Sequence, residues 1–290
     1  MKILVIGATG MAGHMIRDYL LRETNHEIWS TARVNREKAD RYLFLNVQDG
    51  QEVTKVLTRV KPDVVVNAVG ILNRNADQHP SLAVEVNGKF PKLLSRLGLD
   101  LGYRLIHIST DCVFSGKRGN YTETDIRDAT GAYAETKKMG EEIDSQHLVI
   151  RTSIIGPELK EGIGLFHWFM QQKGTIRGYR QAWWNGVTTL ELAKAVKSVL
   201  EQPVKGLVHL CHPEKICKHD LLLLIQQVFG QTQATVEPDD TFHCDKSLVN
   251  TRSDFPYVPP NYSSMLEELR NGMKKSSEPY NQYGIGTTKG

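Results

Sequence analysis

Cysteines and long apolar segments are scarce in this 290-residue chain. Its four cysteines form no C-x-x-C pair and have no zinc-finger spacing, which argues against a disulfide framework or a cysteine-based metal site. No run approaches the roughly 20 apolar residues that span a bilayer. The opening MKILVIGATG has no signal-peptide pattern. We therefore predict a cytoplasmic protein with reduced thiols, no membrane segment and no metal.

An excess of one charge is also missing. Lys and Arg number 36 against 33 Asp and Glu, so the net charge is +3, and the basic residues are scattered rather than grouped. This pattern argues against nucleic-acid binding. The ten histidines include His209 and His212 beside Cys211, but no second pair of ligands completes a metal set.

Short apolar runs alternate with amphipathic stretches along most of the chain. This alternation predicts an α/β fold with a doubly wound, Rossmann-type parallel sheet and a small C-terminal lobe. We expect strands at 2–6, 26–31, 42–46, 63–69, 104–109, 147–152 and 207–210. We expect helices at 11–23, 81–98, 132–145, 163–173, 189–201 and 218–229.

The pattern divides the chain into three parts. Residues 1–157 are predicted to form a dinucleotide-binding domain that later segments can complete, and 158–275 a substrate-binding lobe. Residues 276–290 lack apolar periodicity and are predicted to be a flexible tail.

A glycine-rich loop, GATGMAG at 7–13, follows the first predicted strand and opens the first predicted helix. Gly7, Gly10 and Gly13 allow a tight turn and a close approach of backbone to phosphate. The helix N-terminus offers free N–H groups to a diphosphate. We predict that this loop, with Thr9 and Met11, binds a dinucleotide, although its G-x-x-G-x-x-G spacing differs by one residue from the commoner G-x-G-x-x-G.

The second predicted strand ends without the acidic residue that often binds the ribose of NAD. Arg33 stands there instead, and a guanidinium can pair with the 2′-phosphate of NADP, with Arg36 assisting. We therefore favour NADP over NAD. Later strand ends place Asn46 and Val47 beside the adenine, and Ala68, Val69 and Gly70 at the ligand edge of the sheet.

A tyrosine and a lysine four residues apart, Tyr133 and Lys137, lie on one face of a predicted helix. An ammonium group nearby favours a phenolate, so we expect Lys137, together with a positively charged nicotinamide, to lower the pKa of Tyr133. Thr110 ends the strand before them, where its hydroxyl can hydrogen-bond a substrate carbonyl. The order of glycine loop, threonine and Y-x-x-x-K indicates an enzyme.

These motifs resemble an extended short-chain dehydrogenase/reductase, and most closely the dTDP-4-dehydrorhamnose reductase family. The matching segments are GATGMAG, VNAVG at 66–70, VNGKFPKLL at 86–94, HISTDCVFSG at 107–116, Y-x-x-x-K with a following GE, and RTSIIGP at 151–157. The resemblance implies that Thr110 binds the carbonyl, that Tyr133 is the proton donor, and that Lys137 tunes Tyr133 and binds the ribose. It further places four residues near the nicotinamide or active site: Asn87, Ser109, Ser153 and Ile155.

The C-terminal part departs from the family pattern. Where the family often has Gln-x-Gly-x-Pro-Thr, this chain reads RQAWWNGVTTLELAKAV. Trp183 and Trp184 could stack on a base or sugar or belong to the core. Arg177 and Arg180 could bind a substrate diphosphate or remain solvated. Asp111 is predicted to contact substrate. Related dehydratases usually carry an acidic pair directly after the threonine, whereas here Asp111 is followed by Cys112, so the resemblance disfavours dehydration.

The resulting hypothesis is NADPH-dependent reduction of a nucleotide-linked 4-keto-6-deoxysugar, which by resemblance would serve surface-polysaccharide synthesis. Two alternatives remain open. One is a nucleotide-sugar epimerase with tightly bound cofactor, and the other is a non-catalytic, reductase-like regulatory subunit. Helices beside the tyrosine helix could pair two subunits into a homodimer.

Overall fold

The fold is built on a seven-stranded, all-parallel sheet in the order β11-β6-β5-β4-β1-β2-β3. The computed structural model describes residues 1–33, 40–160, 162–276 and 278–284. The sheet strands are β1 (Lys2–Ile6), β2 (Glu27–Ala32), β3 (Tyr42–Phe44), β4 (Val64–Asn67), β5 (Arg104–Thr110), β6 (Leu148–Thr152) and β11 (Gly206–Leu210). The predicted doubly wound α/β fold is confirmed.

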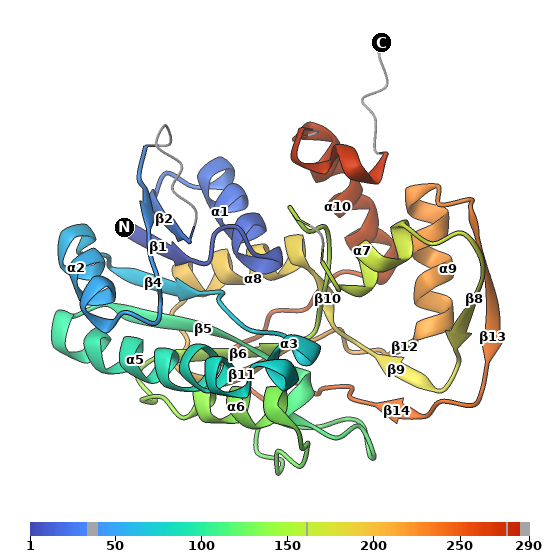
Figure 1. The fold of residues 1–290 in the computed structure, drawn as a ribbon, viewed down its shortest axis with the longest axis horizontal. Coiled ribbons are helices and arrows are strands. Elements are labelled where there is room, and N and C mark those ends of the chain that lie inside the picture. The colour runs from blue at the N-terminus through green and yellow to red at the C-terminus, as the bar shows by residue number, and fades with distance from the viewer. Residues whose placement is uncertain (34–39, 161, 277, 285–290) are drawn as a thin grey trace.

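Helices cover both faces of the sheet (Figure 1). Helices α1 (Met11–Glu23) and α8 (Thr189–Glu201) pack together on one face, and α2 (Gly50–Val60), α5 (Phe90–Leu101) and α6 (Ala132–Glu141) lie on the other. Side chains of β1 alternate accordingly: Ile3 and Val5 join one core cluster, Leu4 and Ile6 the other. Because the strands are buried on both faces, their sequences are unbroken apolar runs.

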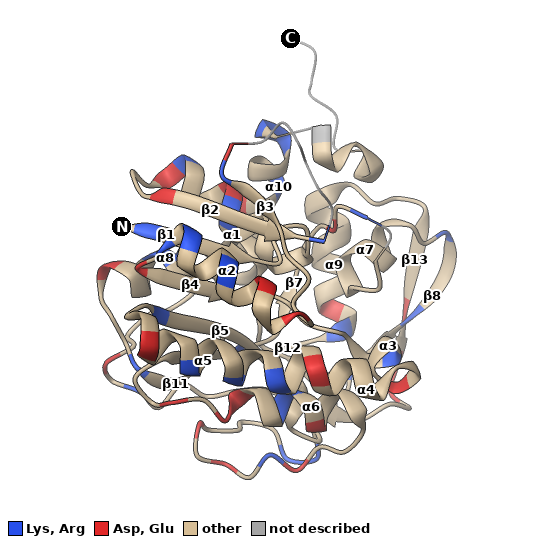
Figure 2. Ribbon diagram, turned by 60° about the vertical axis from the view of Figure 1, so that its left-hand side comes forward, with Lys and Arg blue, Asp and Glu red and all other residues tan. Residues whose placement is uncertain are grey.

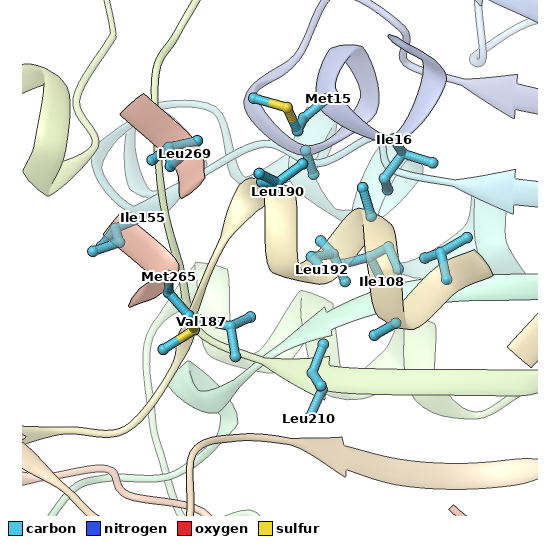
Figure 3. Close-up of a cluster of buried hydrophobic side chains, with 14 of the residues drawn as sticks. Met15, Ile16, Ile108, Ile155, Val187, Leu190, Leu192, Leu210, Met265 and Leu269 are labelled. Atoms are coloured by element: carbon cyan, nitrogen blue, oxygen red, sulfur yellow. The ribbon is translucent and has the colours of Figure 1, made fainter. Parts of the chain in front are cut away.

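The larger core cluster joins the sheet to the C-terminal half of the chain. Figure 3 shows Met15 and Ile16 of α1 facing Leu190 and Leu192 of α8. Residues from α10 (Tyr262–Lys275) complete this core, including Leu269, which is fully buried. The two halves therefore share one hydrophobic core.

The C-terminal lobe consists of short strands and three helices. Strands β7 (Ile154–Ile155) and β10 (Val187–Thr188) are paired, as are β8 (Gly174–Tyr179) and β13 (Ala234–Asp239). Strand β9 (Ala182–Trp184) lies between β12 (Ile216–Cys217) and β14 (Cys244–Asp245). Helices α7 (Leu165–Met170) and α9 (Lys218–Phe229) lie beside these strands, with α10 packed on α9.

Several elements differ from the sequence prediction. Helix α2, which was not predicted, begins at Gly50 and is capped by Asp49, whose carboxylate accepts hydrogen bonds from the backbone N–H groups of Gln51 and Glu52. The predicted helix at 81–98 is interrupted: α3 (Asn73–Gln78) and α4 (Pro80–Ala83) precede a π-helical segment, η1 (Val84–Lys89), before α5. A short 3₁₀ helix, η2 (Asp111–Val113), follows β5.

The predicted flexible tail is wrong for residues 278–284. A 3₁₀ helix, η3 (Glu278–Tyr283), buries two tyrosines, Tyr280 and Tyr283, which are only 3% and 7% exposed. Their hydroxyls hydrogen-bond ring nitrogens of His14 (3.1 Å) and His167 (2.7 Å). Tyr280 and Tyr283 therefore hold this segment against α1 and α7, although its sequence lacks apolar periodicity. The rest of the predicted tail, 285–290, lies outside the described residues.

Figure 2 shows Lys and Arg positions interspersed with Asp and Glu positions along the ribbon. This distribution agrees with the small net charge of +3. Within the described ranges, every helix is too short or too polar to cross a membrane.

Candidate active site

The glycine loop between β1 and α1 forms a tight cradle. Gly7 has a φ of +89°, and the backbone N–H of Gly10 donates to the Gly7 carbonyl at 2.9 Å. A Cβ on Gly13 would lie 2.1 Å from that same carbonyl oxygen. Helix α1 can therefore approach β1 only because position 13 is glycine. The tight turn predicted from the loop glycines is present between Gly7 and Gly10.

This packing gives a testable prediction. Gly13→Ala should lower the free energy of unfolding by roughly 1 to 3 kcal/mol, because the added methyl must displace the loop. We also expect weaker NADPH binding, measured by fluorescence titration, since the phosphate cradle moves with the loop. Gly50→Ala is the control, because its Cβ would meet only Leu93 at an ordinary 3.6 Å. Equal behaviour of the two variants would contradict a special role for Gly13.

A cavity, here called the glycine-loop cavity, opens at the carboxyl ends of β1, β2, β3 and β4. Its lining combines nine of the residues predicted to bind cofactor: Gly7, Thr9, Gly10, Arg33, Asn46, Val47, Ala68, Val69 and Gly70. A Cβ on Gly7 would lie 2.8 Å from Val69 and narrow the cavity. Backbone-lined walls and a free helix N-terminus suit a dinucleotide. Arg33 is exposed at the rim, and Arg36 lies outside the described residues.

A more open depression of about 780 Å³ adjoins this cavity on the α2 side, at Asn46 and Gln48. Its other lining residues come from the start of α2 and from α5. It contains neither the glycine loop nor the Thr110–Tyr133 pair, so we do not place chemistry there.

Thr110 lies at the end of β5, where the sheet opens toward the C-terminal lobe. Its side-chain oxygen accepts a hydrogen bond from the backbone N–H of Cys112 at 3.1 Å, which caps η2. The hydroxyl donates to Asp111 at 3.2 Å. The threonine is 8% exposed. These contacts hold the hydroxyl at the strand end with one rotamer favoured.

Tyr133 begins the first turn of α6 and interacts with Thr110. Burial raises the pKa of Tyr133, and the nearby Asp111 carboxylate adds to the rise, while a hydrogen bond with Thr110 lowers it. In the chain by itself the pKa of Tyr133 is therefore raised, because the loss of hydration is the largest effect. The expected lowering by Lys137 together with a bound nicotinamide stays a prediction. A phenol with a raised pKa stays protonated at neutral pH and can act as a proton donor.

Lys137 lies one turn further along α6 and is 4% exposed. Its Nζ donates to the carbonyl oxygen of Ile108 at 2.9 Å. Burial lowers the pKa of Lys137 to about 8, and the charge of Glu141 partly opposes this. The buried ring of His107 is kept neutral, because burial and the charge of Lys137 hold its pKa well below the ordinary value.

A buried ion pair fixes the end of α6 to the sheet. The Glu141 carboxylate accepts hydrogen bonds from Arg151 of β6 at 3.0 and 2.7 Å and from the Ser109 hydroxyl at 2.6 Å. The side chains of Glu141 and Arg151 are 1% and 2% exposed. Burial raises the pKa of Glu141, but the hydrogen bond and charge of Arg151 outweigh it, so the pKa lies below its usual value. Ser109 thus helps to hold Glu141 against the sheet.

Asn87, Ile155 and Met11 were also predicted near the cofactor, and none of them lines the glycine-loop cavity. The Asn87 side chain bonds the backbone N–H and carbonyl of Ile71, at 2.8 and 2.9 Å, and the Thr136 hydroxyl at 3.2 Å. It thereby braces the loop after β4 against α6. The Ile155 side chain is 3% exposed and belongs to the larger core cluster. Met11 lies beside Gly164, where a Cβ would be 3.3 Å from its sulfur.

A second cavity, of about 430 Å³, lies between the end of β5 and the C-terminal lobe. We call it the tryptophan cavity. It brings together all four predicted substrate residues, Asp111, Arg177, Trp183 and Trp184, and also Ser153. Trp184 is 4% exposed and packs in the larger core cluster as well.

Sequence reasoning missed other residues of this cavity, notably Tyr179, Lys218, Phe242 and Lys246. They come from β8, α9 and the segments around β14, and no local motif joins them. A Cβ on Gly186, two residues after Trp184, would lie 1.9 Å from the Ser153 carbonyl oxygen, so this close approach requires glycine. Thr188 caps α8, because its side-chain oxygen accepts a hydrogen bond from the backbone N–H of Glu191.

The glycine-loop cavity, the strand-end threonine and the Y-x-x-x-K helix together define an extended short-chain dehydrogenase/reductase. The chain belongs to the family described as "RmlD substrate binding domain", whose sequence profile matches residues 1–247.

Three relatives illustrate the range of this similarity. The chain is 26% identical to dTDP-4-keto-6-deoxy-D-glucose reductase of Streptomyces niveus over 81% of each chain. It is 23% identical to methionine adenosyltransferase 2 subunit beta of Mus musculus over 96% of this chain and 88% of that one. A crystal structure of dTDP-4-dehydrorhamnose reductase from Bacillus anthracis in complex with NADP has the same fold, with a TM-score of 0.79 at 18% identity, covering 94% and 99% of the two chains.

Proposed function

We propose that the protein is an NADPH-dependent reductase of a nucleotide-linked 4-keto-6-deoxysugar. The observation that carries this proposal is that Thr110 and Tyr133 interact at the end of β5, where Asp111 lines the tryptophan cavity. The similarity to a keto-deoxysugar reductase over 81% of the chain supports the same substrate class.

The reaction needs a hydride for the carbonyl carbon and a proton for the carbonyl oxygen, and a bound reduced nicotinamide supplies the hydride. The Thr110 hydroxyl donates a hydrogen bond that orients the carbonyl oxygen and stabilises its developing charge. Tyr133 then gives its phenolic proton to that oxygen. The ammonium of Lys137 stabilises the resulting phenolate, and water restores the proton.

The preference for NADPH is proposed to depend on Arg33. We expect Arg33→Ala to raise the Kd for NADPH roughly 10- to 100-fold, the loss of one hydrogen bond to a charged group. Binding of NADH should change less than about twofold, because it lacks the 2′-phosphate. Arg22→Ala is the control, since Arg22 is exposed and pairs with Glu23. Equal losses for both cofactors would contradict this role.

The function itself is tested by NADPH oxidation. Purified protein is offered freshly prepared nucleotide-linked 4-keto-6-deoxysugars that vary in the nucleotide and in sugar stereochemistry, with NADH in parallel. Turnover of one member establishes a reductase and identifies its substrate. Absence of turnover by a protein that still binds NADPH would reject the proposal.

A second candidate is a subunit that assists another enzyme. The similarity to methionine adenosyltransferase 2 subunit beta over nearly the whole chain favours it over the remaining alternative, an epimerase with permanently bound cofactor. A stable complex with a second enzyme, recovered by co-purification and accompanied by no sugar turnover, would support the subunit. Nicotinamide retained through purification would support the epimerase. A homodimer remains a proposal, which light scattering on the purified chain would test.

A further inference from the structure

Two lysines line the floor of the tryptophan cavity, Lys218 at the start of α9 and Lys246 just after β14. The Lys218 ammonium lies 5.3 Å from the centre of the Trp184 ring. Lys246 contacts the thiol of Cys112 and lies close enough to Asp111 to interact electrostatically with its carboxylate. Both therefore lie near the strand end that carries Thr110.

Neither lysine is neutralised by a direct partner. Among the residues that the structure describes, no carboxylate lies within ion-pair distance of either ammonium. Burial lowers the pKa of Lys218 to about 8, with the charge of Asp111 opposing the change. Burial also disfavours the charge of Lys246, but the nearby Cys112 and Asp111 outweigh it, so the pKa of Lys246 is raised. Both lysines are therefore held as cations close together in one aromatic cavity, an arrangement that a bound anion would stabilise.

Other basic residues near the cavity are already paired. Arg177 is 75% exposed and lies 3.5 Å from Asp239, and Arg180 pairs with Asp240. Lys215 lies over the Trp183 ring at 5.2 Å and pairs with Asp245 at 2.5 Å. The cations available to a ligand are thus those at the cavity floor, not the arginines that the sequence suggested.

We propose that Lys218 and Lys246 form an anion-binding subsite that receives a phosphate or carboxylate group of the substrate. In a nucleotide-linked sugar, this group is either the diphosphate or a carboxylate on the sugar ring. The choice between these two sources rests on the proposed function, whereas the subsite does not. The Trp184 ring would stabilise the charged form of Lys218 through a cation–π interaction and hold the ammonium in place.

The test measures binding rather than turnover. NADPH-saturated protein is titrated calorimetrically with uridine diphosphate, thymidine diphosphate, uridine and glucuronate. Lys218→Met and Lys246→Met keep the length of the apolar stem and remove the charge. Lys215→Met is the matched control, because it removes a nearby lysine that already has a carboxylate partner. Lys218→Gln is a second variant in case Lys218→Met does not fold, which melting curves establish.

Each floor variant is expected to weaken binding of a nucleoside diphosphate at least 10-fold, with uridine affected less than twofold. A lysine-dependent loss seen only for glucuronate would keep the subsite and assign it to a sugar carboxylate. The subsite is rejected if wild-type protein binds neither anion, if the floor variants bind as wild type, or if Lys215→Met is equally damaging. Lysine-dependent binding by a protein that reduces no sugar would retain the subsite and reject the reductase.

Discussion

Tyr133→Phe protein is expected to bind NADPH with an unchanged Kd and to turn over substrate roughly 10²- to 10⁴-fold more slowly, the usual contribution of a positioned proton donor. The substitution removes only the phenolic oxygen, which interacts with Thr110. The aromatic ring, which α6 carries in its first turn, is retained. Stopped-flow measurement of NADPH oxidation under single-turnover conditions separates the chemical step from product release.

Three further variants make this result specific. Thr110→Ser keeps a hydroxyl at the end of β5 and should retain most of the rate, whereas Thr110→Val should lose it. Tyr19→Phe, on α1 beside the larger core cluster, should behave as wild type. A Tyr133→Phe protein that retained most of its rate would reject the proposed proton transfer, whatever the sugar.

The second large effect concerns stability. Glu141→Gln should lower the free energy of unfolding by roughly 3 to 5 kcal/mol, because it leaves the buried guanidinium of Arg151 without its counter-charge. The Arg127 guanidinium, 3.2 Å from the same carboxylate, loses its nearer charged partner and keeps Glu142 at 3.8 Å. Urea unfolding followed by circular dichroism measures the change. Glu142→Gln is the control. Glu142 is 55% exposed and pairs with Lys92 and, at 3.8 Å, with the partly exposed Arg127, so the change should cost less than about 1 kcal/mol.

The same pair predicts a dependence on pH. The pKa of Glu141 in the folded chain is below its ordinary value of 4.5, so its ionised form stabilises the fold. That stabilisation is fully present above the unfolded pKa and is lost as pH falls through the folded pKa. The difference between wild type and Glu141→Gln should therefore be constant from about pH 6 to 8 and shrink below about pH 4. A difference that persists at low pH would mean that packing, not charge, is responsible.

The sequence was most informative where local signals and burial agree. Strand β1 and helices α1, α8 and α9 occur at the predicted residues, because each joins a clear apolar pattern to a definite start or stop. Helix α2 was missed although its signals are present in the sequence. Asp49 is a good cap, and Val53, Val56, Leu57 and Val60 repeat at the spacing of one helix face. The π-helical η1 could not be predicted, because its wider turn is imposed by tertiary packing.

The two cavities differ in the same way. The glycine-loop cavity is built from strand ends, and parallel strands bring those ends to one edge, so its residues could be predicted from order alone. The tryptophan cavity collects residues from β8, β9, α9 and β14. Their meeting depends on how the C-terminal lobe folds, which explains why Trp183 was found and Lys218 was not. The raised pKa of Tyr133 likewise results from burial, which a spacing of four residues does not reveal.

The position of β11 has a consequence for synthesis on the ribosome. Strand β6 is buried on both faces, yet its outer neighbour in the sheet, β11, begins only at Gly206. At 5–20 residues per second, the nascent chain would expose the β6 edge for roughly 3 to 10 s before β11 arrives. An apolar, unpaired edge invites association with other chains. A truncation at residue 157 would make that interval permanent, so such a fragment should aggregate rather than fold as an isolated nucleotide-binding domain.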